Sequence, residues 1–188
     1  MNVFGILEKL WLALMVFWLL TAFGQKRAVF RESAARSAGF RIGSVIAALL
    51  MFSGWAAVGV LGWRVTPETR VMEWLALCIG AAGFAVAFWA RILLGREWSS
   101  QVTLKEDHRL IVAGPYAVVR HPIYSGLLLA MLGTALAGGE LRMYLAVGVI
   151  FGAFWYKSRL EERLLVSAMG DRYVEYQQHT YALIPGLL

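Results

Sequence analysis

The sequence contains little charge for its length. Asp, Glu, Lys and Arg make up 16% of the 188 residues, whereas 60% are hydrophobic and 13% are aromatic. A soluble domain typically carries about 25% charged residues, and a single core could not bury so much apolar surface. Disordered chains have the opposite composition, with low hydrophobicity and high charge. The composition therefore excludes a soluble globular domain and a disordered chain, and it predicts a multi-pass membrane protein.

Cysteine and histidine are scarce as well. The single Cys78 lies in an apolar stretch, so no intramolecular disulfide can form. The three His occur without HExxH, CxxC or another metal-ligand spacing, and neither GxSxG nor a P-loop is present. We therefore expect no catalytic metal. The net charge of +6 does not indicate a nucleic-acid partner, because excess Lys and Arg in a membrane protein more often mark cytoplasmic loops.

Long apolar runs with charged flanks predict about five transmembrane helices. We expect them at 3–23, 42–63, 73–94, 122–138 and 141–156. A transmembrane helix needs about 20 residues, so five of them leave room only for loops and a tail. The predicted fold is therefore all-α, with two helices and a basic loop in residues 1–72 and a core in residues 73–188. The sequence contains no signal for an oligomeric state.

Basic residues are distributed unevenly between the two predicted membrane faces. Of the 18 Lys and Arg, most lie in the loop after the first predicted span, in the loop 95–121 or in the tail 157–180. Because cytoplasmic loops are enriched in Lys and Arg, the N-terminus is predicted outside and the tail in the cytoplasm. The loop and the tail are also the most polar parts of the chain, so we expect any chemistry there.

The end of the loop 95–121 combines turn signals with titratable and aromatic residues. Gly114-Pro115 favours a turn, and Pro122 suits the first turn of a helix, where no N–H is needed. Free N–H groups at this helix start would form a weak anion or carboxylate site. The side chains around it are Tyr116, Arg120, His121 and Tyr124. An alternative of equal weight is that the Tyr and Arg residues anchor the chain at the interface and His121 caps the helix.

The tail 157–180 has the pattern of an amphipathic helix. Its apolar residues recur at helical spacing, at Leu160, Leu164, Leu165, Ala168 and Met169. Glu161 and Glu162 follow the fifth predicted span by about one turn. On these residues alone, a solvated helix with pairs of neighbouring charges is favoured. The functional alternative is that one of the two carboxylates binds a cation or a ribose beside the loop.

Together, these two blocks resemble a known family. The string HRLIVAGPYAVVRHPIYSG, preceded by ARILLGREWS and followed by EERLLVSAMGDRYVEY, is similar to the isoprenylcysteine carboxyl methyltransferase and phospholipid methyltransferase superfamily. The similarity extends from Trp89 to Pro185, and the compact five-span plan looks more like the prokaryotic members. The resemblance implies S-adenosyl-L-methionine-dependent methylation of a lipid-like or isoprenoid-like acceptor. Membrane lipids and an amphiphilic substrate would be the partners, at the cytoplasmic face of a prokaryotic inner membrane.

The resemblance also implies site residues. Cofactor contacts would fall on Gln101, His108, Arg109, Leu110, Ile111, Gly114, Tyr116, His121, Pro122, Ile123, Tyr124 and Glu161, with Glu162 as the adjacent alternative. Lys157 or Arg159 would hold the acceptor. Because the eukaryotic protein methyltransferases have Arg at the position aligned with Lys157, a prenylated protein is a doubtful acceptor. A carboxylate acceptor needs only to be positioned, whereas an amine acceptor needs a proton acceptor, for which His121 or a glutamate is suited.

Two other classes of function stay open. Sterol reductases resemble this family in their C-terminal helical scaffold, and Arg109 and Arg120 could bind the 2′-phosphate of NADPH, so a membrane reductase is one alternative. A non-enzymatic membrane scaffold or transporter is the other. The central parts of the predicted spans hold almost no ionisable groups, apart from Glu8 and Lys9 near one end, which argues against a transport path.

Overall fold

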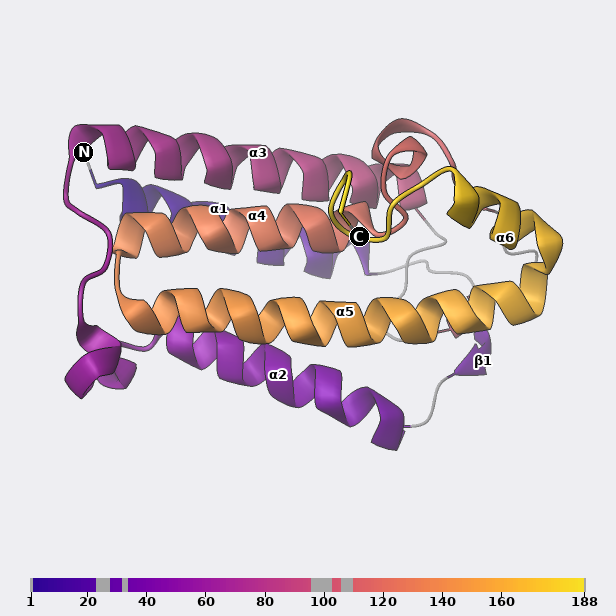
Figure 1. The fold of residues 1–188 in the computed structure, drawn as a ribbon, viewed down its shortest axis with the longest axis horizontal. Helices are drawn as coiled ribbons and strands as arrows, with labels where there is room; N and C mark the ends of the chain where they lie inside the picture. The colour runs from indigo at the N-terminus through magenta and orange to yellow at the C-terminus, as the bar shows by residue number, and fades with distance from the viewer. Residues whose placement is uncertain (1, 23–27, 32–33, 96–102, 106–109, 188) are drawn as a thin grey trace.

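Helices form most of the protein. The computed structural model describes residues 2–22, 28–31, 34–95, 103–105 and 110–187 (Figure 1). The helices are α1 (Val3–Thr21), α2 (Ala34–Phe52), α3 (Arg70–Leu94), α4 (Pro122–Gly138), α5 (Leu141–Met169) and α6 (Asp171–Gln178). Helices α2 to α5 run lengthwise beside one another, in the order α3, α4, α5, α2, and α1 packs behind α3 and α4 (Figure 1).

One short sheet departs from the all-α prediction. Strand β1 (Ala28–Arg31) pairs antiparallel with β2 (Thr103–Lys105). The pair joins the basic segment before α2 to the loop before α4, which are 70 or more residues apart in the sequence. Strands of three and four residues are too short to show a periodic pattern that would distinguish them from a loop.

Helices α3 and α4 are in close backbone contact because glycines line their interface. A Cβ atom added to Gly83 would lie 2.3 Å from the backbone nitrogen of Ala130, and one added to Gly133 would lie 2.4 Å from that of Gly80. Small residues at helix interfaces allow this approach, which is common in membrane proteins. The contact fixes the position of α4, and hence of the loop that precedes it, against α3.

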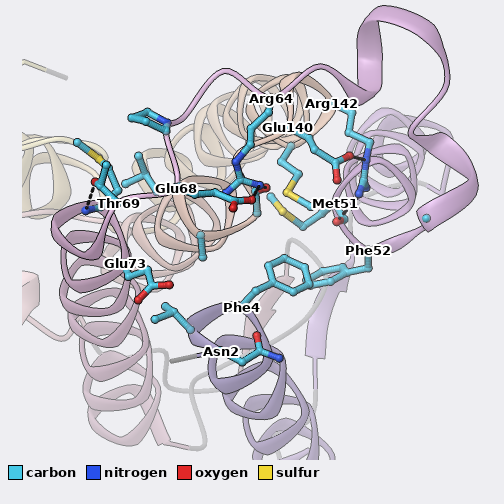
Figure 2. Close-up of a pocket in the computed structure, with 18 residues that line it drawn as sticks. Asn2, Phe4, Met51, Phe52, Arg64, Glu68, Thr69, Glu73, Glu140 and Arg142 are labelled. Atoms are coloured by element: carbon cyan, nitrogen blue, oxygen red, sulfur yellow. Dashed lines mark hydrogen bonds and ion pairs between the residues drawn. The ribbon is translucent and has the colours of Figure 1, made fainter.

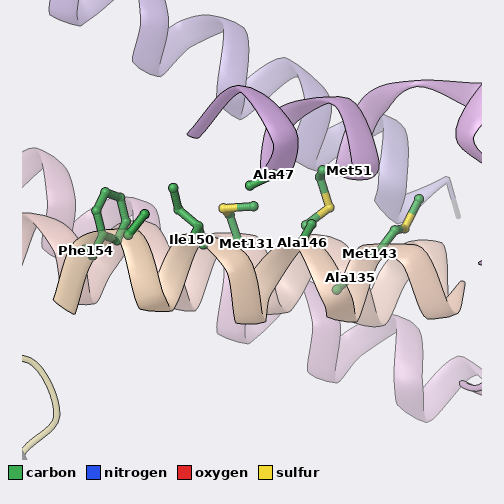
Figure 3. Close-up of a cluster of buried hydrophobic side chains, with 9 residues drawn as sticks. Ala47, Met51, Met131, Ala135, Met143, Ala146, Ile150 and Phe154 are labelled. Carbon is green, nitrogen blue, oxygen red and sulfur yellow. The ribbon is translucent and has the colours of Figure 1, made fainter. Parts of the chain in front are cut away.

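Helices α2 and α5 form the second close pair. Ala47 and Met51 of α2 face Ala146, Ile150 and Phe154 of α5 in the main buried cluster (Figure 3). Met131 and Ala135 of α4 and Met143 of α5 complete this cluster. The cluster therefore links α2, which is remote in sequence, to the two helices that carry Tyr124, Glu161 and Glu162.

The predicted second span, 42–63, is wrong in both boundaries. Helix α2 ends at Phe52, and the apolar residues after it form two 3₁₀ turns, η1 (Gly54–Ala56) and η2 (Gly59–Gly62). Gly59 has a φ of +55°, which ordinary residues rarely adopt, so the chain turns here instead of continuing as a helix. Hydrophobicity alone did not reveal this break.

The predicted division between the fifth span and the tail is also wrong. Helix α5 continues without interruption from Leu141 to Met169, because no glycine or proline separates Tyr156 from Met169. The tail predicted as one helix at 157–180 breaks at Gly170, which has a φ of +56°, and α6 follows. The remaining spans agree closely with the helices, and α4 has the predicted bounds. Helix α3 begins three residues before the predicted position. Thr69 caps its start, because the Thr69 hydroxyl accepts a hydrogen bond from the N–H of Met72.

Among the described residues, two helices are long and apolar enough to cross a membrane. These are α1 and α3, whereas α4 and residues 38–52 are apolar but shorter. Large apolar side chains such as Leu12, Leu19 and Leu20 on α1 are more than half exposed. An exposed apolar helix surface of this kind is suited to lipid rather than water.

Candidate functional site

The residues expected to carry chemistry lie at one end of the molecule. There the start of α4, the second half of α5, α6 and the C-terminal segment meet, at the right of Figure 1. The backbone N–H groups of Arg120 and His121 donate to the carbonyls of Tyr181 and Ala182, at 2.8 and 3.1 Å. The protein's own C-terminal segment therefore binds the backbone of the two residues that precede α4, while the expectation of free N–H groups in the first turn of α4 stays a prediction.

Two glutamates of α5 meet the residues at the start of α4. Arg120 Nε lies 2.7 Å from Glu162 Oε1, and His121 Nε2 lies 3.3 Å from the same oxygen. The other ring nitrogen of His121 lies 3.4 Å from Glu161 Oε2, and the Tyr124 hydroxyl donates to Glu161 Oε1 at 2.7 Å. We call these five residues the carboxylate cluster. It joins the two sequence blocks that were predicted to lie side by side.

The electrostatics of the carboxylate cluster favour charged forms on both sides. Burial lowers the pKa of His121, but its hydrogen bonds to Glu161 and Glu162 outweigh burial and raise the pKa above its ordinary value. Burial raises the pKa of Glu162, but hydrogen bonds from His121 and Arg120 lower it to about 2. The pKa of Glu161 is lowered as well, because the hydrogen bond from His121 and the charge of Lys157 outweigh burial. These shifts all favour the ion-paired form, in which an imidazolium lies between two carboxylates.

The two glutamates differ in what they contact. The side chain of Glu162 is 4% exposed and also lies 3.4 Å from Arg159 Nη1, so basic groups surround it. The side chain of Glu161 is 20% exposed and faces Tyr124 and Lys157. Glu162 therefore holds the cluster together, and Glu161 is the carboxylate that a ligand can reach.

A row of stacked rings continues from the carboxylate cluster towards α2. The ring of Tyr124 stacks on His121 with centroids 5.5 Å apart and on Phe154 at 4.7 Å, and Phe154 stacks on Phe40 at 6.0 Å. The ammonium of Lys157 lies 4.3 Å from the Phe40 ring centroid and 5.4 Å from that of Tyr124. Sequence reasoning missed Phe40 and Phe154. Phe154 could have been found from its position one turn before Lys157, but nothing in the sequence around Phe40 marks it.

Lys157 and Arg159, the two candidates for holding the acceptor, point to different places. Lys157 is buried and lies 3.9 Å from Glu161 Oε1. The side chain of Arg159 is 47% exposed, and its guanidinium lies 4.0 Å from the Trp155 ring centroid. Both residues therefore contact the carboxylate cluster, Lys157 as a buried side chain beside Glu161 and Arg159 as a half-exposed side chain beside Glu162.

The remaining candidates line the approach to α4. Tyr116 is buried, its hydroxyl donates to the Ala90 carbonyl at 3.3 Å, and it packs with Ile111 and Ile123. Gly114 has a φ of +59° and lies against Leu93, so the turn predicted here is confirmed. Leu110 is half-buried, and Pro122 is buried. Gln101, His108 and Arg109 lie outside the described residues.

Arg120 is fully engaged within the protein. Besides Glu162, its guanidinium donates to the carbonyl of Gln177 at 3.3 Å and to the carbonyl of Thr180. It therefore ties α4 to the segment after α6. In the reductase alternative, Arg120 would bind the 2′-phosphate of NADPH, and it would have to break these contacts to do so.

A cavity of about 520 Å³ lies at the opposite end of the molecule, between the first residues of α1 and α3 and the hairpin that joins α4 to α5 (Figure 2). Arg142 donates to the carbonyls of Leu50 and Met51, at 2.6 and 3.2 Å, and pairs with Glu140 at 2.6 Å. In the same way Arg64 donates to the Gly138 carbonyl at 2.9 Å and pairs with Glu68 at 3.1 Å. These arginines cap the ends of α2 and α4, which explains their presence without a ligand.

No candidate residue from the sequence lines this cavity. In the described ranges, no group of three or more His, Cys, Asp or Glu is arranged to hold a metal ion. The carboxylate cluster is therefore the stronger candidate site.

Comparisons with known proteins agree with this assignment. The family model of the phospholipid methyltransferases matches residues 71–172, which include the whole carboxylate cluster. A protein-S-isoprenylcysteine O-methyltransferase of Schizosaccharomyces pombe is 34% identical over 99 residues, which cover 51% of this chain and 42% of that protein. A methanethiol S-methyltransferase of a Pseudomonas species is 27% identical over 168 residues, which cover 83% of this chain and 62% of that protein.

A solved structure has a similar fold. It is the eukaryotic intramembrane Ras methyltransferase ICMT (isoprenylcysteine carboxyl methyltransferase), with a TM-score of 0.52 and 22% identity, covering 85% of this chain and 55% of that one. This chain thus spans about half the length of the curated relatives it matches. Because the family model covers more than half of the chain, the protein belongs to the phospholipid methyltransferase family.

Proposed function

We propose that the protein is an S-adenosyl-L-methionine-dependent methyltransferase that acts on an amphiphilic acceptor at the membrane surface. One observation carries the proposal: His121 bridges Glu161 and Glu162, so the two blocks that resemble the family form one site. This site lies within the residues that the family model matches. The names of the two relatives, which describe methylation at oxygen and at sulfur, support the same reaction class.

The residues present fit the proposed cofactor. When bound, S-adenosyl-L-methionine supplies an activated methyl group on a sulfonium centre. Glu161 is a partly exposed carboxylate that can bind a cation or ribose hydroxyls. The hydrogen bonds from His121 and Tyr124 fix the orientation of the Glu161 side chain. The buried residues around the cluster exclude water, which helps alignment of the reacting groups.

The state of His121 favours an acceptor that needs no base. Both ring nitrogens face carboxylates and the pKa of His121 is raised, so the imidazolium has no free lone pair to take a proton. A carboxylate acceptor is already nucleophilic, and Lys157 need only hold it. We therefore propose O-methylation of an acid with an apolar body in preference to N-methylation of an amine.

The membrane arrangement is part of the proposal. The carboxylate cluster is built from residues of, or next to, the loop 95–121 and the tail 157–180, the two segments predicted to be cytoplasmic. The apolar surfaces of α1 and α3 would face lipid, with the shorter helices packed beside them. A prokaryotic inner membrane is the setting that fits the compact predicted plan.

The test uses the full chain purified into lipid nanodiscs. Its thermal midpoint is measured with S-adenosylmethionine, with S-adenosylhomocysteine and with NADPH, because only a ligand that binds the folded state raises the midpoint. Methyl-labelled cofactor is then incubated with the protein and a lipid extract, with and without mild alkali to cleave methyl esters. The proposal predicts stabilisation by the two adenosyl compounds and alkali-labile label. Stabilisation by NADPH alone, or by none of the three, would overturn it.

A further inference from the structure

Phe40 reaches the candidate site from a part of the chain that the family model does not match. It lies on α2, whereas the matched residues begin at position 71. Its ring centroid lies 4.3 Å from the Lys157 ammonium, and that of Tyr124 lies at 5.4 Å. Neither the sequence motifs nor the family comparison assigns it a role.

The packing of α2 on α5 holds Phe40 in this place. One turn along α2, a Cβ atom added to Gly43 would lie 3.1 Å from Ala153 Cβ, so the two helices are in close contact there. Ala153 lies one turn before Lys157 on α5, and the contact between Phe40 and Lys157 therefore continues the same interface. Farther along, Ala47 and Met51 extend the interface into the buried cluster (Figure 3).

Burial lowers the pKa of the Lys157 ammonium, and the charge of Glu161 acts in the opposite direction. The Lys157 side chain is 7% exposed, and a buried ammonium is costly unless charges or aromatic faces compensate for its lost hydration. Glu161 lies 3.9 Å from the ammonium, and the rings of Phe40 and Tyr124 also contact it. Unlike a carboxylate, a ring orients the ammonium without neutralising its charge.

We propose that Phe40 is a positioning residue that holds the Lys157 ammonium where it binds the anionic head of the acceptor. The inference rests on the proposed function and deepens it, because it makes the protein's preference for an acid over an uncharged analogue depend on a residue of α2. A cation–π contact at a desolvated site is worth on the order of tenfold in binding, so the effect is large enough to measure.

The experiment measures binding rather than turnover. The wild-type protein in nanodiscs is titrated with an S-prenyl thioether carboxylic acid and with the matching uncharged amide, and the ratio of the two dissociation constants is recorded. The same ratio is measured for Phe40→Leu and Phe40→Met, which remove the ring, for Phe40→Trp, which keeps one, and for Lys157→Met. Phe88→Leu is the matched control, because Phe88 of α3 makes an edge-to-face contact with Phe17 of α1 in another helix pair. Binding of S-adenosylhomocysteine reports on folding and on the proposed function.

The wild type and Phe40→Trp are expected to bind the acid about tenfold more tightly than the amide. The ratio should fall to about threefold or less in Phe40→Leu and Phe40→Met, and to about one in Lys157→Met, while Phe88→Leu keeps the wild-type ratio. The role of Phe40 would be overturned if the wild type bound the acid and the amide equally well. It would also be overturned if both Phe40→Leu and Phe40→Met kept the wild-type ratio of dissociation constants while S-adenosylhomocysteine still bound. Loss of S-adenosylhomocysteine binding by the wild type would instead overturn the proposed function.

Discussion

The two ends of the helical bundle use the same residue types differently. At the cavity end, Arg142 and Arg64 each pair with one glutamate and cap the carbonyls of a helix end. At the site end, Glu161 and Glu162 converge on one histidine, and a row of stacked rings extends from it. The charges at the cavity end are explained by the helices that they terminate. Those at the site end include Glu161 and Lys157, which face each other at 3.9 Å and cap no helix end.

Geometry, rather than residue type, distinguishes the charged residues that stabilise a helix end from those that form a candidate site. A buried arginine that donates to the free carbonyls of a helix end stabilises that end and needs no ligand. A buried cationic histidine held between two carboxylates is expensive to desolvate, and such arrangements cluster at functional sites. The comparison predicts that substitutions at the two ends affect stability and ligand binding in different proportions.

The largest effect is expected from Glu162→Ala. This substitution leaves the buried Arg120 and His121 without their shared carboxylate, and breaking a buried ion pair costs about 3–5 kcal/mol. Denaturant unfolding in detergent measures the change. Glu68→Ala is the control from the cavity end, where the Glu68 side chain is 76% exposed and its pair with Arg64 is worth about 1 kcal/mol or less. Equal destabilisation by the two substitutions would contradict the distinction between the ends.

Arg142→Met is expected to destabilise the protein by about 2–3 kcal/mol, because it removes charge-assisted hydrogen bonds to Leu50 and Met51. Affinity for S-adenosylhomocysteine should stay unchanged, since Arg142 lies at the far end from Glu161. Unfolding and calorimetric titration of the same preparation check both parts. A large loss of affinity without a loss of stability would give the cavity end the functional role that we assign to the other end.

The smallest effect is a change of stability with pH. The pKa of folded His121 is raised, so its contribution is fully present below the unfolded value of 6.5 and is lost as pH rises through the folded pKa. The pKa of Glu162 is lowered to about 2 from 4.5, so its contribution is lost as pH falls from 4.5 towards 2. Thermal midpoints should therefore fall on both sides of neutrality. In His121→Gln the alkaline decline should be reduced, and an unchanged alkaline slope would mean that His121 is neutral in the folded protein.

The sequence predicted which two blocks would lie together, but it missed the end of one helix. The blocks around His121 and Glu161 were expected to meet, and they do, because the short α4–α5 hairpin brings the start of α4 back beside the second half of α5. The end of α2 at Phe52 was missed, since the segment after it is as apolar as a span but turns at Gly59. The place of Phe40 could not be foreseen, because it depends on how α2 packs on α5.

The choice between Glu161 and Glu162 also required the structure. Neighbouring residues on a helix point about 100° apart, but both glutamates reach His121, so the spacing alone does not show which of them can face a ligand. Which one does so depends on Arg120 and Arg159, which surround Glu162 and leave Glu161 beside Tyr124. The same reasoning separates Lys157 from Arg159.

The central claim is that the reachable carboxylate at the site end, and not a carboxylate at the cavity end, binds the cofactor. Calorimetric titration of S-adenosylhomocysteine into Glu161→Gln and Glu140→Gln tests it directly, because each substitution removes one negative charge from an Arg-containing network with little change in shape. We predict that Glu161→Gln weakens binding at least about tenfold while Glu140→Gln binds like the wild type, in keeping with the loss of a charge-assisted hydrogen bond. Wild-type affinity in Glu161→Gln, in a protein that remains folded, would contradict the account.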